Sequence, residues 1–278
     1  RPMRGRKAAA ARRPDLTTRI VMIGCGNMGG ALLARWGRLD GLEFTVVDPA
    51  GPDVPAGVAL KDSADALEGG TFQALIVAVK PQLVDQAIPP AARRLEKDGV
   101  AISIAAGTGA DSVSRAANGA PAIRLMPNMP ARIGQGVTGL YADPACTGEH
   151  KTLAARLGEA VGTAIWLADE DQVDRITAAA GSGPGYVFDF ARAYQDAAEA
   201  LGFDADQARA LTLQTLAGCM ALAEKTGQPF DALRDSIMSK GGTTAAGVEV
   251  LNEGGELDTR MRAALGAAYA RALELRGG

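Results

Sequence analysis

Residues 19–142 alternate short apolar runs with longer segments whose apolar residues recur every three or four positions. The runs are rich in β-branched residues and show little polar alternation, which is typical of strands buried on both faces of a parallel sheet. They predict strands over 19–23, 44–47, 74–79, 100–104, 122–125, 136–142 and 163–167. The segments between them predict helices over 31–39, 82–98, 112–117 and 151–160. Repeated strand–helix–strand units predict an α/β fold with a doubly wound, mostly parallel sheet.

No strand-like run follows Asp169, and the rest of the chain predicts helices alone. Their expected boundaries are Gly181, Pro184, Gly202, the capping pair Asp204 and Gln207, and Gly227 before Pro229. In the helix after Asp204, one stripe repeats at helical spacing through Ala208, Leu211, Thr215, Cys219 and Leu222. Alanine covers several faces of these helices, which favours a dimerisation bundle over packing within a single chain.

Charge is distributed unevenly along the 278 residues. Six of the 29 basic residues and none of the 32 acidic ones lie in the first thirteen positions. We interpret residues 1–16 as a basic disordered tail in preference to a targeting or nucleic-acid arm. The remaining chain is acidic, which argues against nucleic acid as a partner. No apolar run is long enough to cross a membrane, so a soluble protein without a membrane partner is expected.

The cysteines and the histidine restrict the chemistry. Cys25, Cys146 and Cys219 are odd in number and form no CxxC pair, which indicates reduced thiols and predicts a cytoplasmic protein. His150 is the single histidine and lies in a polar stretch. A zinc site or a Ser-His-Asp triad therefore lacks the necessary residues, and no metal site is predicted.

A glycine-rich turn follows the first predicted strand. It reads GCGNMG, comprises Gly24, Cys25, Gly26, Asn27, Met28 and Gly29, and leads into a helix. In a dinucleotide-binding turn the first glycine permits the bend, the second admits the diphosphate and the third lets helix and strand pack closely. Asp48 ends the second strand, where a carboxylate can accept hydrogen bonds from the adenosine ribose. This context predicts a Rossmann-type sheet that binds NAD(P)H, with NADH preferred because of Asp48.

Two more strand ends fit the same ligand, because ligands bind outside the carboxyl ends of strands in such sheets. Lys80 and Pro81 follow one strand, where the lysine either contacts the cofactor or is a solvated turn residue. Ala105, Ala106 and Gly107 follow the next, and their small side chains would let a nicotinamide ring lie against the backbone.

The helical half holds two further glycine-rich segments. Residues 181–185 read GSGPG and residues 239–244 read SKGGTT, and each opens a helix. The second offers backbone N–H groups and hydroxyls at a helix start, which suits a small carboxylate. An ordinary capped helix start is the alternative interpretation.

Six segments, in their order and spacing along the chain, resemble those of one known family: GCGNMGGALL, AVKPQ, SIAAGT, RLMPNMPARIGQG, DRITAAAGSGPGYVF and SIMSKGGTTAAGVEVL. Over residues 17–275 the chain resembles pyrroline-5-carboxylate reductase, the last enzyme of proline biosynthesis. The resemblance implies hydride transfer from NAD(P)H to the imine carbon of 1-pyrroline-5-carboxylate, the carbon that is C5 of the product L-proline. It also implies a cofactor-binding domain over 17–168 and an all-helical dimerisation and substrate domain over 169–278. A homodimer, or a higher oligomer of dimers, is expected.

The resemblance also implies roles for single residues. The substrate would be bound by Glu170, Ser239, Gly241, Gly242, Thr243 and Thr244, with Thr244 at the ring nitrogen as the catalytic group. Contacts to the cofactor are implied for Cys25, Asn27, Met28, Ser63, Val79, Lys80 and Ala106. Two departures fall beside these motifs, because Met238 and Met129 stand where the family usually has smaller residues.

Two alternatives remain at this point. A β-hydroxyacid dehydrogenase also joins such a sheet to helices, but it carries a catalytic lysine after the helix-opening glycine. This chain has Val187 and Ala191 at the matching positions. A non-catalytic dinucleotide sensor would keep the glycine turn, but it would have no use for SKGGTT.

Overall fold

The computed structural model describes residues 17–277. The chain divides into two compact units, one ending at Val173 and the other beginning at Asp174, and each is described by itself. The basic tail predicted over 1–16 lies outside the described residues.

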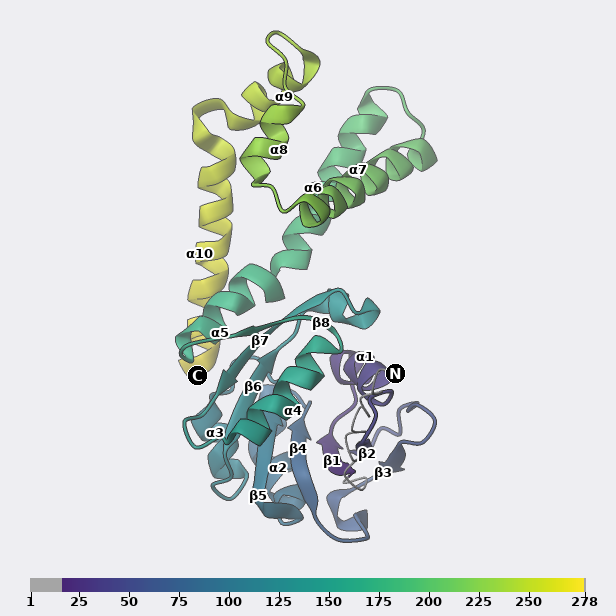
Figure 1. Cartoon of the computed structure of the whole chain (residues 1–278), viewed down its shortest axis with the longest axis vertical. Helices are drawn as coiled ribbons and strands as arrows, with labels where there is room; N and C mark the ends of the chain where they lie inside the picture. The colour runs from purple at the N-terminus through teal and green to yellow at the C-terminus, as the bar shows by residue number, and fades with distance from the viewer. Residues whose placement is uncertain (1–16, 278) are drawn as a thin grey trace, which may run out of the picture. The chain divides into compact units, whose positions relative to one another are not determined.

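The first unit is built on one eight-stranded sheet (Figure 1). Its strands are β1 (Thr18–Ile23), β2 (Leu42–Val47), β3 (Ala59–Lys61), β4 (Phe72–Val77), β5 (Leu95–Ser103), β6 (Ala122–Met126), β7 (Gly136–Ala142) and β8 (Gly162–Trp166). Their order in the sheet is β3-β2-β1-β4-β5-β6-β7-β8. Every neighbouring pair is parallel except β6 and β7. The predicted doubly wound, mostly parallel sheet is confirmed.

Helices cover both faces of this sheet. They are α1 (Asn27–Trp36), α2 (Val84–Ala92), α3 (Ala110–Ala116) and α4 (Gly148–Glu159), with the short 3-10 turns η1 (Ala64–Ala66), η2 (Pro81–Leu83) and η3 (Met129–Ile133). Side chains alternate across a strand, so Ile20 and Met22 of β1 join one apolar cluster with α1 and α4. Val21 and Ile23 join a second cluster with α2 and α3. The core thus lies in two layers, one on each face.

The sequence prediction was wrong at two places in this unit. Residues 95–98 were expected to continue the helix, but α2 ends at Ala92 and residues 95–103 form β5. Leu95 pairs with Phe72 of β4, and the Gln73 side chain donates to Glu96 at 2.6 Å. Pairing with a neighbouring strand therefore overrides the helical spacing. The short edge strand β3 was missed, since three residues carry no periodicity.

As predicted, the described residues of the second unit form helices and turns without a strand. They are α5 (Asp171–Ile176), which spans the boundary, the π-helical turn η4 (Thr177–Gly181), α6 (Gly183–Ala200), α7 (Ala205–Thr226), α8 (Phe230–Ser236), α9 (Thr243–Asn252), the 3-10 turn η5 (Glu253–Gly255) and α10 (Glu256–Gly277). The predicted capping pair is confirmed, because Gln207 N–H donates to Asp204 and Asp204 N–H donates back to Gln207. Gly227 ends α7 in the left-handed conformation, at φ 63°.

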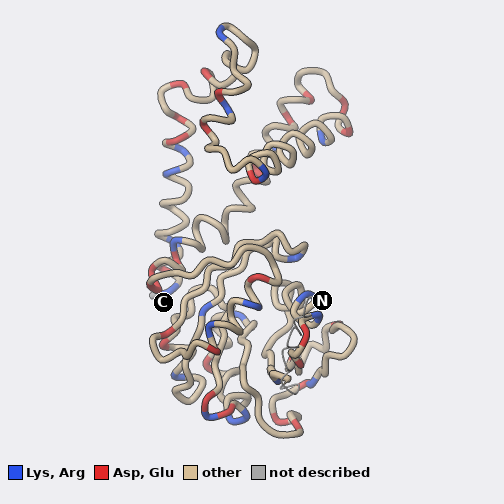
Figure 2. The backbone as a smooth tube through the Cα atoms, viewed as in Figure 1, with Lys and Arg blue, Asp and Glu red and all other residues tan. Residues whose placement is uncertain are grey.

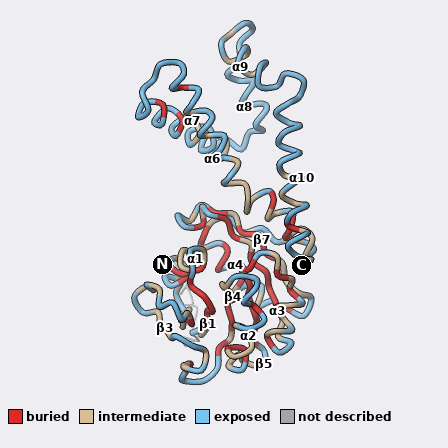
Figure 3. The backbone as a smooth tube through the Cα atoms, turned by 180° about the vertical axis from the view of Figure 1, so that it is seen from behind, coloured by how far each residue is buried: buried red, intermediate tan, exposed pale blue. Residues whose placement is uncertain are grey.

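This helical unit buries little of its apolar surface. Figure 3 shows buried backbone concentrated in the sheet unit, while α6 to α10 are mostly exposed. In the predicted stripe of α7, Ala208 is buried but Leu211, Cys219 and Leu222 are exposed in the single chain. Charged residues of both signs are scattered along α6 and α7, with long uncharged stretches between them (Figure 2). The helices therefore present apolar faces that one chain alone leaves open to water.

One buried ion pair holds the end of α10. Arg276 lies 2.6 Å from Asp174 of α5, and the side chains are 34% and 2% exposed. Replacing Arg276 with alanine should destabilise the unit by about 1–3 kcal/mol, because a buried carboxylate loses its cation. Arg271→Ala is the matched control on the same helix, where an exposed pair with Glu274 is worth less than about 1 kcal/mol. Denaturant unfolding measures both variants, and equal losses would contradict the prediction.

Within residues 17–277, no helix has the length and apolar character needed to cross a membrane.

Candidate functional site

The glycine turn after β1 has the geometry that a dinucleotide requires. Gly24 adopts φ +82°, and a Cβ there would lie 2.8 Å from the Ala78 carbonyl oxygen. A Cβ on Gly29 would lie 2.8 Å from the Met22 methyl carbon. Because Gly29 has no side chain, α1 packs closely on β1. Nothing lies within 4 Å of the position that a Cβ would take on Gly26. The turn is thus closed toward the protein at two glycines and open at the third.

The open side coincides with the start of α1. Gly26 is its N-cap, no side chain caps the helix, and its first turn holds no acidic residue. Unpaired N–H groups and the positive end of the helix dipole there suit an anion such as a diphosphate. Asn27 begins the helix, and Met28 packs partly against the apolar core. The residues of this turn therefore fit a bound nicotinamide dinucleotide.

A cavity of about 620 Å³ lies beside the glycine turn. Its lining includes six of the predicted cofactor residues: Gly24, Gly26, Asp48, Ser63, Val79 and Lys80. Four segments far apart in sequence contribute them, at the carboxyl ends of β1, β2, β3 and β4. The cavity thus lies where ligands bind in open α/β sheets.

Sequence reasoning missed part of the lining of this cavity. The lining also includes Asp65 of η1 and Leu83, Gln86, Ala87 and Pro90 of η2 and α2. Those last four recur at three- and four-residue spacing, while Val84, Ile88 and Ala91 face the core. The helical period could have shown that α2 has a second face, but only the fold shows that this face meets a cavity.

Asp48 has more partners than the sequence suggested. One carboxylate oxygen accepts the Cys25 N–H at 2.7 Å, and the other accepts the Ala50 N–H at 2.9 Å. The side chain therefore holds the glycine turn as well as lining the cavity. Burial raises the pKa of the Cys25 thiol, and the nearby Asp48 charge raises it further, so this thiol remains protonated near neutral pH.

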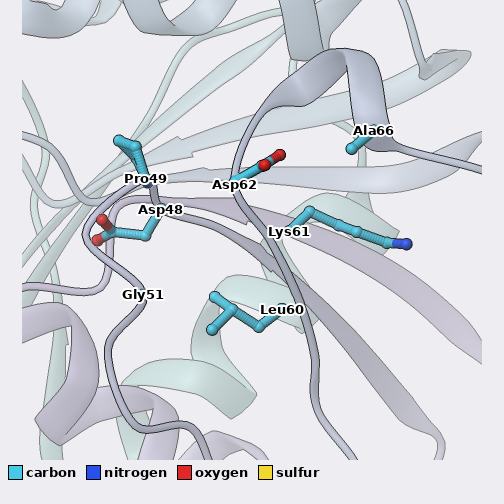
Figure 4. A pocket seen from close by; sticks show the side chains of 7 residues that line it. All are labelled: Asp48, Pro49, Gly51, Leu60, Lys61, Asp62 and Ala66. Carbon is cyan, nitrogen blue, oxygen red and sulfur yellow. The ribbon is translucent and has the colours of Figure 1, made fainter.

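A smaller hollow of about 430 Å³ adjoins Asp48 (Figure 4). Its lining includes Lys61 and Asp62 at the end of β3. Asp48 N–H donates to the Lys61 carbonyl oxygen at 2.9 Å, so the two backbones are neighbours. Figure 4 shows the Lys61 side chain extending away from the Asp48 carboxylate. The acidic groups of this hollow therefore outnumber its single cation.

The remaining predicted cofactor residues do not line the large cavity. Pro81 begins η2 next to Lys80. Ala105 is buried in the core, Ala106 is exposed and Gly107 adopts φ +74° in the loop between β5 and α3. The buried Ser103 hydroxyl accepts the Ala105 N–H at 3.2 Å, which fixes the start of this loop.

Glu170, the predicted substrate contact, lies directly before α5. Its Oε1 atom accepts the Ala110 N–H at 2.7 Å and lies 3.1 Å from the Arg124 guanidinium. One carboxylate oxygen therefore joins the start of α3, β6 and the segment after β8. No sequence pattern indicated Arg124, whose partner is 46 positions away.

The predicted carboxylate-binding segment lies in the other unit, around the start of α9. Gly241 adopts φ +72°, and Gly242 is the N-cap of α9 without a capping side chain. A Cβ on Gly242 would meet the Ser239 hydroxyl oxygen, so a larger residue there would force that side chain to move. Thr243 and Thr244 form the first turn of the helix, and Thr244 is half-buried.

The histidine has a structural role at the start of α4. His150 completes a capping box with Thr147 at the start of α4, and its Nε2 lies 2.9 Å from the Asp98 carbonyl oxygen. Across residues 17–277, no three His, Cys, Asp or Glu side chains are grouped so that they could hold a metal ion.

Comparisons with known proteins show the family to which the chain belongs. Residues 170–275 match the family description "Pyrroline-5-carboxylate reductase dimerisation". Pyrroline-5-carboxylate reductase of Pseudomonas aeruginosa is 34% identical over 267 residues, which span 93% of this chain and 97% of that protein. The solved pyrroline-5-carboxylate reductase of Coxiella burnetii superposes with a TM-score of 0.84 at 32% identity, covering 93% and 98% of the two chains. Pyrroline carboxylate reductase of Plasmodium falciparum, solved with NADP bound, shares the fold at 22% identity and a TM-score of 0.81, covering 94% and 99%.

The glycine turn, its cavity and the helical second unit define an NAD(P)H-dependent oxidoreductase with a Rossmann-type sheet. Within that class, the chain belongs to the pyrroline-5-carboxylate reductase family. The resemblance found in the sequence is confirmed, and the hydroxyacid dehydrogenase and sensor alternatives are set aside.

Proposed function

We propose that this chain transfers a hydride from NAD(P)H to the imine carbon of 1-pyrroline-5-carboxylate, which becomes C5 of the product L-proline, in the last step of proline biosynthesis. The observation that carries the proposal is the presence, in one chain, of the glycine-turn cavity and of the family's dimerisation region over 170–275. When bound, the nicotinamide supplies the hydride.

The protein's own residues then bind and orient the reactants. Gly26 and the first N–H groups of α1 hold the diphosphate, while Ala105, Ala106 and Gly107 would flank the nicotinamide. The 239–244 segment binds the substrate carboxylate, since the N-cap of α9 carries no side-chain acceptor that would compete. Thr244 bonds the ring nitrogen, and Glu170 contributes a further contact.

These binding and orienting residues suffice for catalysis because the substrate needs little chemical activation. A cyclic imine near neutral pH is readily protonated, so its carbon is already electrophilic. Catalysis then consists mostly of bringing two reacting carbons together in the right orientation. A threonine hydroxyl is too weakly acidic to act as a general acid, so Thr244 positions the nitrogen rather than protonating it.

An NADH preference is the finer part of the proposal. Asp48 lines both cavities, Asp65 lines the larger and Asp62 the smaller. These three carboxylates would face the ribose end of the cofactor, and Lys61 extends away from Asp48 (Figure 4). A 2′-phosphate placed about 4 Å from one such carboxylate is disfavoured by roughly 1–4 kcal/mol.

We expect kcat/KM for NADH to exceed that for NADPH by about tenfold or more. Asp48→Asn should lower the ratio of kcat/KM for NADH to kcat/KM for NADPH. The asparagine would still have one oxygen to accept the Cys25 N–H. Asp48→Ala is unsuitable because it would loosen the glycine turn for both cofactors. Asp40→Asn, on an exposed loop, is the matched control. A clear NADPH preference in the unaltered protein would contradict this assignment.

The assembly we propose is a homodimer, alone or within an oligomer of dimers. The support is the exposed apolar surface of the helical unit, which includes Val187, Phe188, Phe190, Leu213, Met220, Leu222, Phe230, Val250 and Leu251. Patches of this kind on a single chain mark association surfaces.

Three free thiols suit a reducing compartment such as the cytoplasm.

A spectrophotometric assay tests the reaction. Adding 1-pyrroline-5-carboxylate to the purified chain and NADH should cause absorbance loss that depends on the substrate and yields L-proline. Omitting the substrate is the control. A folded, dinucleotide-binding protein that shows no turnover with NADH or NADPH would refute the proposal.

A further inference from the structure

Arg124 is a buried charge whose role the reaction described above does not include. It lies in the middle of β6, its side chain is 3% exposed, and its charged partner is Glu170, which is 27% exposed. A buried guanidinium is costly unless a well-placed partner compensates it. An apolar residue would fill the same space at lower cost, so the pair calls for an explanation beyond packing.

The pair is tied to one particular loop. The Glu170 oxygen that lies 3.1 Å from Arg124 also accepts the Ala110 N–H at 2.7 Å. Ala110 begins α3 and ends the loop that follows β5. The other end of this loop is held by the Ser103 hydroxyl, which accepts the Ala105 N–H. Residues 105–110 are therefore fixed at both ends by side-chain oxygens.

Tyr141 of β7 lies in the same cluster as Arg124 and Glu170. It pairs with Arg124 in the sheet register. Burial raises the pKa of its hydroxyl, and the charge of Glu170 is the next largest cause. Without Arg124, the Glu170 carboxylate would lose its counter-charge and the orientation in which it accepts the Ala110 N–H.

We propose that Arg124 is a positioning residue for hydride transfer. Through Glu170 it holds the loop over residues 105–110, against which the nicotinamide ring would lie. This inference rests on the proposed function, since it concerns the same cofactor. A displacement of about 1 Å between reacting groups can lower a rate about a hundredfold, so a loosened loop should affect the hydride step more than cofactor affinity.

The test uses the full-length protein with Arg124→Lys, Arg124→Gln and Arg124→Met. We expect the Gln and Met variants to lose at least about tenfold in kcat, with a larger primary isotope effect from 4-deuterated NADH and a smaller change in NADH affinity. The Lys variant keeps a cation beside Glu170 and should recover most of the loss. Arg115→Met, at the exposed end of α3, is the matched control and should behave as the unaltered protein.

A second measurement needs no turnover. Amide hydrogen exchange of the cofactor-free protein should be faster in the loop over 105–110 for Arg124→Met than for Arg124→Lys or Arg115→Met. If Arg124→Met does not fold, the Lys and Gln variants carry both measurements.

Folded Gln and Met variants with unchanged kcat, isotope effect and loop exchange would overturn the inference, and so would equal losses in the Lys and Gln variants. An unaltered protein that binds NADH but never reduces the imine would instead refute the proposed function, and the exchange result would still report on the loop.

Discussion

Replacing Thr244 with valine should lower kcat by about 10- to 100-fold without unfolding the protein. Valine keeps the shape of threonine but removes the hydroxyl that would bond the ring nitrogen of the imine. A hydrogen bond to a charged group contributes about 1.5–3 kcal/mol, and each 1.36 kcal/mol corresponds to about tenfold in rate. Steady-state kinetics with saturating NADH measure the loss.

The matched control for this variant is Thr259→Val on α10. That hydroxyl is exposed and donates to the carbonyl oxygen of Gly255, the last residue of η5, directly before α10. It should leave kcat unchanged, and circular dichroism should report the same fold for both variants. Full activity in a folded Thr244→Val protein would remove Thr244 from the mechanism.

Mixing two impaired variants, each with little activity of its own, should restore about a quarter of the unaltered activity. For the proposed homodimer we expect each active site to combine the glycine turn of one chain with the 239–244 segment of its partner. Gly26→Val blocks the diphosphate, and the structure has room for the new side chain, since nothing lies within 4 Å of its Cβ position. Thr244→Val is defective in the other segment.

The expected recovery of about a quarter follows from the two-fold symmetry of the dimer. After subunit exchange, half the dimers are hybrids, and each hybrid has both defects in one site and an intact second site. If each site were built within one chain, every site in the mixture would keep a defect. Hybrid dimers verified by mass spectrometry that recover no activity would therefore reject the shared site.

The sheet could be predicted from sequence because β-branched apolar runs separated by helical periods have few other solutions. β3 could not, because it is three residues long and held by pairing with β2. Residues 95–98 carried a helical pattern, yet Leu95 and Glu96 are drawn into the sheet by Phe72 and Gln73. Contacts made across the chain decided these cases, and local propensity cannot report them.

Some residues of the candidate site could likewise be predicted from the sequence, and others could not. Gly24, Gly26 and Gly29 were predictable because each satisfies a local backbone or packing requirement of the turn. Asp48 was predicted as a ribose acceptor, but its bond to the Cys25 N–H spans 23 positions and emerges only in the fold. Arg124 gave no signal, since an arginine within an apolar strand has meaning only once its carboxylate partner is known.

The most direct measurement of the central claim is the fate of the hydride itself. The purified chain would be incubated with 1-pyrroline-5-carboxylate and NADH that carries deuterium at both C4 positions, and the product would be examined by mass spectrometry and NMR. We expect L-proline with one deuterium, located at C5 of the proline ring. Proline without deuterium, deuterium at another carbon, or no proline at all from a folded, NADH-binding protein would contradict it.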